Sequence, residues 1–250
     1  MHNRAVEPAE YQLMDEAEDG MWWYRALHAR VLDALDPGDR AGGGPVLDAG
    51  CGTGGFLWRL RRAFPDARAA GLEFNPDAAA RARAKAGVPV AAGSVNAVPF
   101  ADAAFGSLVS LDVLCHAAVE PDRALAEFHR VLRPGGLLVL NLPAFQWLYS
   151  AHDVRVHTRR RFTAEDVGAL LAAAGFAEVR ARYWNSLLFP LMVLQRKVLA
   201  RGPGSASDVS LPPPWLNRGF HAATALERRA AAAGLRFPAG GSVLATAVRP

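Results

Sequence analysis

The sequence predicts an α/β protein whose core is a doubly wound sheet of seven strands. Short apolar segments typical of buried strands alternate with helical patterns over residues 45–142, an order that favours parallel strands with helices on both faces. The first strand runs directly into a glycine-rich turn, which lies at the ligand-binding edge of such sheets. With 250 residues, 51% of them hydrophobic, the chain can bury one large core. We therefore expect one domain over residues 1–250.

The first strand, residues 45–49, ends at the turn Gly50-Cys51-Gly52-Thr53-Gly54-Gly55. Glycine has no Cβ, so the backbone of this turn can approach a ligand closely. A helix expected over residues 55–64 follows, and its free N–H groups and positive dipole end suit an anionic or carboxylate-bearing group. The glycines are spaced G-x-G-x-G-G, whereas a dinucleotide site would read G-x-G-x-x-G. The turn therefore indicates a nucleotide-type cofactor and leaves its identity open.

The second strand, residues 69–73, ends in the carboxylate of Glu73, which can accept hydrogen bonds from both hydroxyls of a ribose. Asn75-Pro76 then supplies a cap and a first-turn proline for a helix over residues 78–86. Glu73 could therefore instead be a charge at the N-terminus of that helix.

The third and fourth strands are expected over residues 88–94 and 107–111. Asp112 follows the fourth strand, where the C-terminal end of a parallel strand should meet the ligand crevice. Residues 130–140 then fit a helix end, a Pro-Gly-Gly stop and a fifth strand.

These segments together resemble the class I S-adenosylmethionine-dependent methyltransferases. Asp48-Ala49-Gly50-Cys51-Gly52-Thr53-Gly54 matches the first motif of that family at every place, and residues 130–140 match its post-motif. The resemblance covers about residues 45–143 and implies a Rossmann-like sheet with the cofactor bound to this core. It also implies a helical N-terminal lid over residues 1–40 and an acceptor loop over residues 144–162.

The resemblance implies S-adenosylmethionine as the methyl donor and the one cofactor; we predict no metal. The residues expected to contact the donor are Asp48, Gly50, Cys51, Gly52, Glu73, Phe74, Ser94, Val95, Leu111, Asp112, Tyr24 and Arg25. In the family an aspartate that binds the adenine amine often stands where this chain has Ser94, whose hydroxyl can also accept. Val95 is expected to hold the ring by its backbone N–H and by packing, and Arg25 to pair with the donor carboxylate.

The leading segment, residues 7–36, is expected to form one or two helices with apolar residues at helical spacing. In the small-molecule branch of the family, such aromatic-rich helices usually fold over the cofactor as a lid. The resemblance therefore implies that Trp23, Tyr24, Arg25 and His28 touch the donor. The alternative is that the two tryptophans of this segment pack the helix onto the sheet.

The acceptor loop carries three chemically versatile side chains, His152, Asp153 and His157. Three interpretations stay open: His152 or His157 is a general base that Asp153 orients, all three bind a metal ion, or the loop is a solvated structural turn. The candidate catalytic residues are these two histidines and His116, which could instead pack beneath the cofactor. Arg159-Arg160-Arg161 either binds a phosphate or carboxylate of the acceptor or is a solvated charge run.

The carboxyl-terminal part is expected to complete the sheet. A helix over residues 163–174 begins at a capping-box-like Thr163-Ala164-Glu165-Asp166, and the sixth strand follows at residues 176–184. A helix over residues 221–233 then precedes the seventh strand at residues 242–248. Two antiparallel strands at this end fit the family.

Residues 185–219 form an insertion before the last strand that the minimal fold does not need. Its first half, residues 187–199, is apolar and then basic, and it could rest on a membrane surface, wall an apolar acceptor pocket or form a subunit contact. Its second half, residues 201–214, is rich in Gly, Ser and Pro and is expected to be a mobile loop.

Composition narrows the function classes further. A net charge of +4, mostly from scattered arginines, does not by itself indicate nucleic acid. Asn141-Leu142-Pro143-Ala144-Phe145 superficially resembles the signature of base-methylating enzymes, but it follows the fifth strand rather than the fourth. Two cysteines favour no disulfide framework, and neither a signal peptide nor a membrane span is evident, so a cytoplasmic location is expected.

We therefore expect methyl transfer to oxygen, nitrogen or carbon of a small-molecule acceptor, aromatic or lipid-like, in biosynthesis. The expected partners exclude nucleic acid and include at most a peripheral membrane contact and a possible homodimer. One alternative is a protein of this fold that binds the donor without catalysis. A nicotinamide-dependent oxidoreductase is a second alternative, against which Pro134-Gly135-Gly136 speaks.

Overall fold

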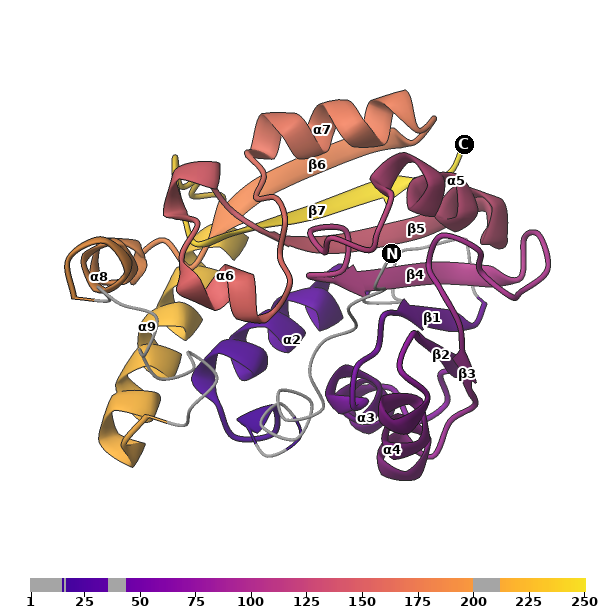
Figure 1. Ribbon diagram of the computed structural model, residues 1–250, viewed down its shortest axis with the longest axis horizontal. Coiled ribbons are helices and arrows are strands. Elements are labelled where there is room, and N and C mark those ends of the chain that lie inside the picture. The colour runs from indigo at the N-terminus through magenta and orange to yellow at the C-terminus, as the bar shows by residue number, and fades with distance from the viewer. Residues whose placement is uncertain (1–14, 16, 36–43, 200–211) are drawn as a thin grey trace.

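A sheet of seven strands in the order β3-β2-β1-β4-β5-β7-β6 forms the centre of the computed structural model (Figure 1). The structure describes residues 15, 17–35, 44–199 and 212–250. The strands are β1 (Val46–Ala49), β2 (Ala69–Glu73), β3 (Val90–Ala92), β4 (Phe105–Leu111), β5 (Leu132–Pro143), β6 (Ala177–Trp184) and β7 (Ser242–Val248). β7 pairs antiparallel with both β5 and β6, and the other neighbouring pairs are parallel. The predicted doubly wound sheet and its antiparallel end are confirmed.

Helices cover both faces of this sheet (Figure 1). The longer ones are α2 (Trp22–Leu35), α3 (Gly55–Ala63), α4 (Pro76–Ala86), α5 (Pro121–Val131), α7 (Ala164–Ala173) and α9 (Pro214–Ala232). The shorter ones are η2 (Gln146–Leu148), α6 (Ala151–Arg155), α8 (Phe189–Leu194) and η3 (Gln195–Leu199). No helix in the described part of the chain is both long and apolar enough to span a bilayer.

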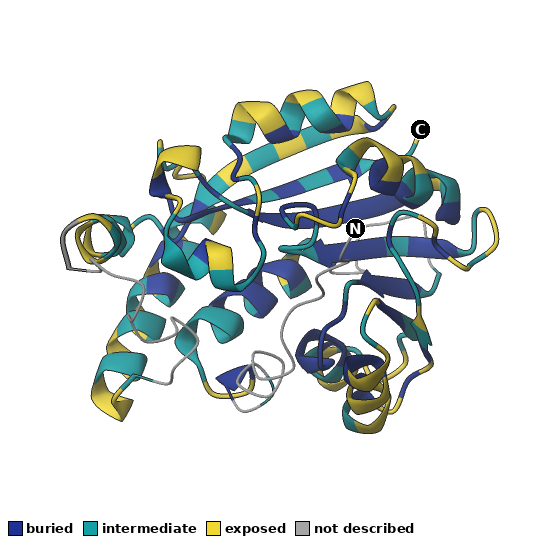
Figure 2. Ribbon diagram, in the orientation of Figure 1, coloured by how far each residue is buried: buried dark blue, intermediate teal, exposed yellow. Residues whose placement is uncertain are grey.

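Side chains that alternate between the two faces of β5 explain how helices pack on both sides of the sheet. Leu138, Leu140 and Leu142 belong to the apolar cluster beneath α5 and α7. Leu137 and Val139 face the opposite cluster, which α2 and α3 cover. Successive side chains of a strand point to opposite faces, so one apolar run serves two cores. Figure 2 shows the resulting band of buried residues through the middle of the sheet.

The local signals at the helix starts are confirmed. The side chain of Asn75 caps α4 by accepting hydrogen bonds from the N–H groups of Asp77 and Ala78 at 2.8 and 3.1 Å. Thr163 and Asp166 form a capping box at the start of α7. The third strand is shorter than predicted, and β5 begins at Leu132, before the Pro-Gly-Gly segment, with a register shift opposite Gly106.

The prediction for the start of α9 was wrong, because the helix begins at Pro214 rather than at residue 221. Contacts with α2 stabilise the added turns: the Asn217 side chain accepts from the Trp22 N–H at 2.8 Å, and the Trp22 ring meets Phe220 edge-on at 5.4 Å. Trp22 therefore packs against α9, whereas Trp23 stacks on Trp184 of β6 at 6.1 Å. Residues 200–211 of the insertion, and the predicted helix before residue 15, lie outside the described residues.

A buried carboxylate joins α9, α2 and the start of the insertion. Glu227 is 1% exposed and accepts hydrogen bonds from the N–H groups of Asn185, Ser186 and Leu187 at 2.7, 2.6 and 3.0 Å. The Arg30 guanidinium of α2 adds a fourth bond at 3.1 Å. A second ion pair between the same two helices, Asp33 with Arg228, is exposed. Glu227 therefore fixes where the chain leaves β6 and enters the insertion.

Replacement of Glu227 should destabilise the fold strongly. Glu227→Ala is expected to lower the free energy of unfolding by about 3–5 kcal/mol, because it leaves Arg30 buried without its carboxylate and three N–H groups without an acceptor. Asp33→Ala is the matched control and should cost below about 1 kcal/mol, since its pair with Arg228 is exposed. Urea denaturation followed by circular dichroism measures both variants. Equal losses would show that Glu227 has no special structural role.

Candidate functional site

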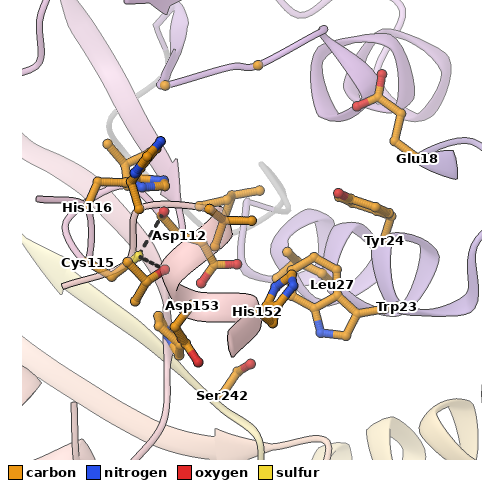
Figure 3. Close-up of a pocket in the computed structure, with 18 of the residues that line it drawn as sticks. Glu18, Trp23, Tyr24, Leu27, Asp112, Cys115, His116, His152, Asp153 and Ser242 are labelled. Carbon is orange, nitrogen blue, oxygen red and sulfur yellow. Dashed lines mark hydrogen bonds between the residues drawn. The ribbon is translucent and has the colours of Figure 1, made fainter. Parts of the chain in front are cut away.

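A cavity of about 1340 Å³ opens at the carboxyl ends of the parallel strands. The three candidate histidines line it, together with every residue predicted to contact the donor except Arg25. Helices α2, α6, α8 and α9 contribute further residues to its wall. Pockets for one drug-sized ligand usually measure 300–1,000 Å³, so this cavity has room for two small molecules. Figure 3 shows Asp112, Cys115 and His116 on the left of the view and Trp23 and Tyr24 of α2 on the right.

The glycine turn forms one end of the cavity. Gly50, Gly52 and Gly54 have φ values of 88°, 54° and 91°, which L side chains rarely adopt. A Cβ on Gly50 would lie 2.3 Å from Cγ2 of Val113, so the turn leaves no space for a side chain there. The predicted need for glycine therefore has two physical causes, backbone conformation and close packing against the segment after β4.

Two carboxylates flank this turn. Glu73 is 5% exposed and accepts hydrogen bonds from the N–H groups of Gly52 and Asn75 at 2.9 and 3.0 Å, so it holds the turn against the end of β2. Asp48 is 2% exposed and has no hydrogen-bond or ion-pair partner among the described residues. Burial, followed by the charges of Glu73 and Glu18, raises the pKa of Asp48 well above its usual range. An unpartnered buried carboxylate beside the glycine turn fits a ligand that carries hydroxyl groups or a cationic amine.

The adenine end predicted at Ser94 and Val95 also borders the cavity. Ser94 Oγ accepts a hydrogen bond from the Asn96 N–H at 3.1 Å, within a tight turn. Val95 is buried in the main core, whereas Phe74 is 45% exposed. The roles of these residues toward the donor stay predictions.

A third buried acid, Glu18, connects the segment before α2 to the glycine turn. It accepts hydrogen bonds from Thr53 Oγ1 at 2.8 Å and from Lys85 Nζ at 2.6 Å. A Cβ on Gly55 would approach its carboxylate to 2.5 Å. The role of Glu18 could not be predicted from the sequence, because its partners lie 35 and 67 residues away along the chain.

His28 of α2 faces the cavity and lies edge-on to Phe56 at 5.5 Å. Burial, followed by the charges of Arg59 and Lys85, lowers the pKa of His28 to about 3, so its imidazole is neutral at physiological pH. The prediction that Arg25 touches the donor finds no support, since Arg25 does not line the cavity.

Asp112 stands at the end of β4 with φ 55°, a left-handed conformation that aspartate tolerates better than most residues. Both of its carboxylate oxygens accept from Asn141 Nδ2, at 3.0 and 3.1 Å. The indole N–H of Trp184 donates to Asn141 Oδ1 at 2.7 Å, which fixes the amide so that its nitrogen faces Asp112. Burial raises the pKa of Asp112 to about 7, although Asn141 and the charge of Arg161 oppose the shift. Asp112 is therefore poised to exchange a proton near neutral pH.

The acceptor loop lies against the segment after β4. The Ala117 N–H donates to the His157 carbonyl at 3.0 Å, and His116 forms a bridge with Thr158. Burial lowers the pKa of His116, and Nε2 of His157 is buried without a hydrogen-bond partner among the described residues. All three candidate histidines thus border one cavity, and their catalytic role stays a prediction.

The contacts of Asp153 and Arg161 weigh against two of the interpretations of the acceptor loop. Asp153 does not orient a histidine: it is 1% exposed and accepts from Arg161 Nε and Nη2 at 2.9 and 3.1 Å and from the Ser150 N–H at 2.9 Å. Arg161 is consequently a buried partner of Asp153 at the cavity wall, whereas Arg159 is exposed, and an anion-binding role for this run stays a prediction. Within the described residues no group of three or more His, Cys, Asp or Glu side chains could hold a metal ion, so the metal interpretation has no support.

Neither cysteine is an activated nucleophile. Cys51 and Cys115 are buried free thiols, and burial is the largest cause that raises the pKa of each. Both thiols are therefore protonated at neutral pH.

Part of the cavity wall is apolar. This part includes Leu188, Leu191 and Met192 from the insertion and Leu216 and Phe220 of α9, whereas η3 adds the polar Gln195 and Arg196. This arrangement favours the acceptor-wall interpretation of the insertion.

Comparison with known proteins matches this geometry. The family model described as "Methyltransferase domain" matches residues 47–140. A malonyl-[acyl-carrier protein] O-methyltransferase of Geobacter sulfurreducens is 30% identical over 66% of this chain and 68% of its own length. An uncharacterized 37.1 kDa protein in transposon TN4556 of Streptomyces fradiae is 33% identical over 61% of this chain. The chain spans 48% of the length of that protein.

Two solved structures share the fold along almost the whole chain. A possible histamine N-methyltransferase of Thermotoga maritima has a TM-score of 0.62 and 20% identity, covering 97% of this chain and 95% of its own. The 4+2 cyclase SpnF has a TM-score of 0.60 and 22% identity, covering 99% of both chains. These likenesses confirm the predicted fold.

Asp112 should give the stability a measurable pH dependence. Its native pKa of about 7 lies above the usual value of 3.8, so the folded state holds the proton more tightly and stability falls as pH rises from about 4 to 7. Asp112→Asn removes this loss of stability, because asparagine has no proton to release. Relative to wild type, the free energy of unfolding of the variant should therefore increase by up to about 4 kcal/mol between pH 4 and pH 8.

Urea denaturation of both proteins at pH 4, 6 and 8 measures this difference. Asp66→Asn, an exposed acid in the turn after α3, is the matched control. A difference between Asp112→Asn and wild type that is the same at every pH would contradict the raised pKa.

Proposed function

The chain belongs to the class I S-adenosylmethionine-dependent methyltransferases, and from this premise we propose that it methylates a small molecule with a large apolar body. Its cofactor is S-adenosylmethionine. The observation that carries the proposal is one cavity with two unlike ends, a glycine turn flanked by buried carboxylates and an apolar wall from the insertion. The donor fits the first end, and the acceptor fits the second.

The chain's own residues would hold the donor chiefly through backbone and carboxylates. Asp48 and Glu73 are the hydrogen-bond acceptors, and the backbone from Gly50 to Gly52 provides the close approach. When bound, the donor supplies an electrophilic methyl group on a sulfonium. The protein therefore mainly has to align the acceptor atom, and positioning alone contributes several kcal/mol.

We assign Asp112 as the group that accepts the acceptor's proton. It lines the cavity, and the only hydrogen-bond partner of its carboxylate among the described residues is the neutral amide of Asn141. A carboxyl group with a pKa of about 7 is ionised in a sizeable fraction at neutral pH and can take a proton from a hydroxyl or ammonium group. His116, His152 and His157 stay our further candidates, because they border the same space.

A donor-binding protein without methyl transfer is the second candidate. A structure named as a cyclase shares the fold over 99% of both chains, so the fold does not by itself fix the reaction. Family membership leaves the nicotinamide-dependent alternative without support. The methylated atom, the homodimer and the cytoplasmic location stay predictions.

Donor binding is the first test. Calorimetry should show micromolar binding of S-adenosylmethionine and S-adenosylhomocysteine, and none of NADPH. Gly50→Ala should weaken donor binding at least tenfold, because its Cβ would meet Val113 Cγ2 at 2.3 Å. Gly135→Ala is the matched control: it has a similar φ of 77°, but no atom lies within 4 Å of its Cβ and it does not line the cavity. Binding of NADPH alone would overturn the proposed cofactor.

The second test separates the donor site from the proton acceptor. In a mass-spectrometric screen of apolar alcohols, amines and acids, Asp112→Asn should lower turnover by about 10²-fold or more, a much larger change than any in donor affinity. Wild-type turnover should rise with pH around a midpoint near 7, since the ionised carboxylate is the active form. His152→Ala and His157→Ala should lower turnover without loosening donor binding.

Unchanged turnover in Asp112→Asn would exclude Asp112 from the chemistry. Unchanged turnover in both histidine variants would remove the acceptor loop from it. Tight donor binding without any methylated product would favour the non-catalytic alternative.

A further inference from the structure

Helix α8 is apolar throughout, yet none of its residues is buried. Its sequence is Phe-Pro-Leu-Met-Val-Leu, and Leu191 and Leu194 are 46% and 45% exposed. Leu187, just before the helix, is 47% exposed. A contiguous group of large exposed apolar residues usually marks an interaction site.

Helix η2 extends this surface. The Trp147 side chain is 50% exposed, and its ring meets Phe189 of α8 edge-on at 6.1 Å. We call the group formed by Trp147, Leu187, Phe189, Leu191 and Leu194 the apolar rim. Figure 1 places α8 at the outer left end of the molecule, away from the sheet, and Figure 2 shows its exposed residues.

The charges beside the rim are basic. Lys197 is exposed, and its ammonium lies 6.0 Å from the Trp147 ring centroid. No acidic residue occurs between residues 187 and 199. Asp153 of α6 is buried, and both Arg161 and Arg196 contact it, while Glu227, which bonds the Leu187 N–H, is also buried and pairs with Arg30. The rim and its surroundings therefore offer apolar contact together with positive charge.

The rim is continuous with the apolar end of the cavity. Leu188, Leu191 and Met192 line the cavity, and Leu191 is also half exposed at the rim. An apolar molecule that leaves a bilayer at the rim would therefore meet the cavity wall directly. A second copy of the chain is a weaker occupant, because a helix of six residues is only about 9 Å long, whereas a stable interface buries about 800 Å² on each partner.

We propose that the apolar rim docks the protein on an anionic lipid bilayer. Trp147, Leu191 and Leu194 enter the interfacial region, where an aromatic ring with a polar edge and aliphatic side chains are favoured. Lys197 contacts the phosphates of the lipid headgroups, an attraction that salt screens. The surface does not depend on the donor, so its test is independent of methyl transfer.

Vesicle flotation tests this proposal with the full-length protein without donor. The protein should float with vesicles of phosphatidylcholine and phosphatidylglycerol, and binding should weaken in high salt and with phosphatidylcholine alone. Leu194→Glu should lower the partition coefficient at least tenfold. Leu235→Glu is the matched control, because it makes the same change at a 54% exposed leucine outside the rim and should leave binding unchanged.

Thermal unfolding and donor affinity report whether each variant is folded. Should Leu194→Glu be unstable, Trp147→Ala replaces it, because this variant changes the rim from a different element and should also reduce vesicle binding. No flotation with anionic vesicles, or an equal loss in Leu235→Glu, would overturn the proposal. A change from dimer to monomer in Leu194→Glu by light scattering would also overturn it, in favour of a second copy on the rim.

Discussion

The four hydrogen bonds that Glu227 accepts are the constraint on which the acceptor side of the cavity depends. They fix the first residues of the insertion and bring Arg30 of α2 to the end of β6. There the guanidinium lies 4.7 Å from the centroid of the Trp184 ring. Trp184 orients Asn141, and Asn141 holds Asp112. One buried carboxylate in α9 is thus connected through side chains to the group at the centre of the cavity.

Two pairs of acids contrast in their charge partners. Asp153 and Glu227 are matched by guanidinium groups, so their burial is offset within the protein. Asp48 and Asp112 have no cationic hydrogen-bond partner among the described residues, and both border the cavity. Burial raises the pKa of each of these two groups. A bound ligand could supply the hydrogen-bond donors or the positive charge that these two carboxyl groups lack in the protein.

The two ends of the cavity are built by different means. Backbone conformation, glycine and the ends of β1 and β2 shape the donor end, which leaves little freedom to vary. Side chains of α8 and α9, from the insertion and the helix after it, shape the acceptor end. The structure therefore fits a donor site built on the glycine turn and a proposed acceptor site that the insertion helps to line, and the outer face of the same insertion forms most of the apolar rim.

The sequence by itself determined the sheet, the glycine turn and the positions of Glu73 and Asp112 at strand ends, because these features depend on local periodicity, turn chemistry and caps. Asn141 is a polar residue inside an apolar strand, and this exception to the pattern was the available sign that it has a special role. The pattern did not indicate its partners. Only the tertiary structure decided which distant side chains form hydrogen bonds. Trp184 bonds Asn141, 43 residues away, and Thr53 bonds Glu18, 35 residues away. Asp153 pairs with Arg161 rather than with a histidine. The tertiary structure also set the start of α9, through contacts with α2. These outcomes depend on which buried polar groups come into contact in the folded chain. Contacts between residues far apart in the sequence cannot be read from the spacing of residues along the chain.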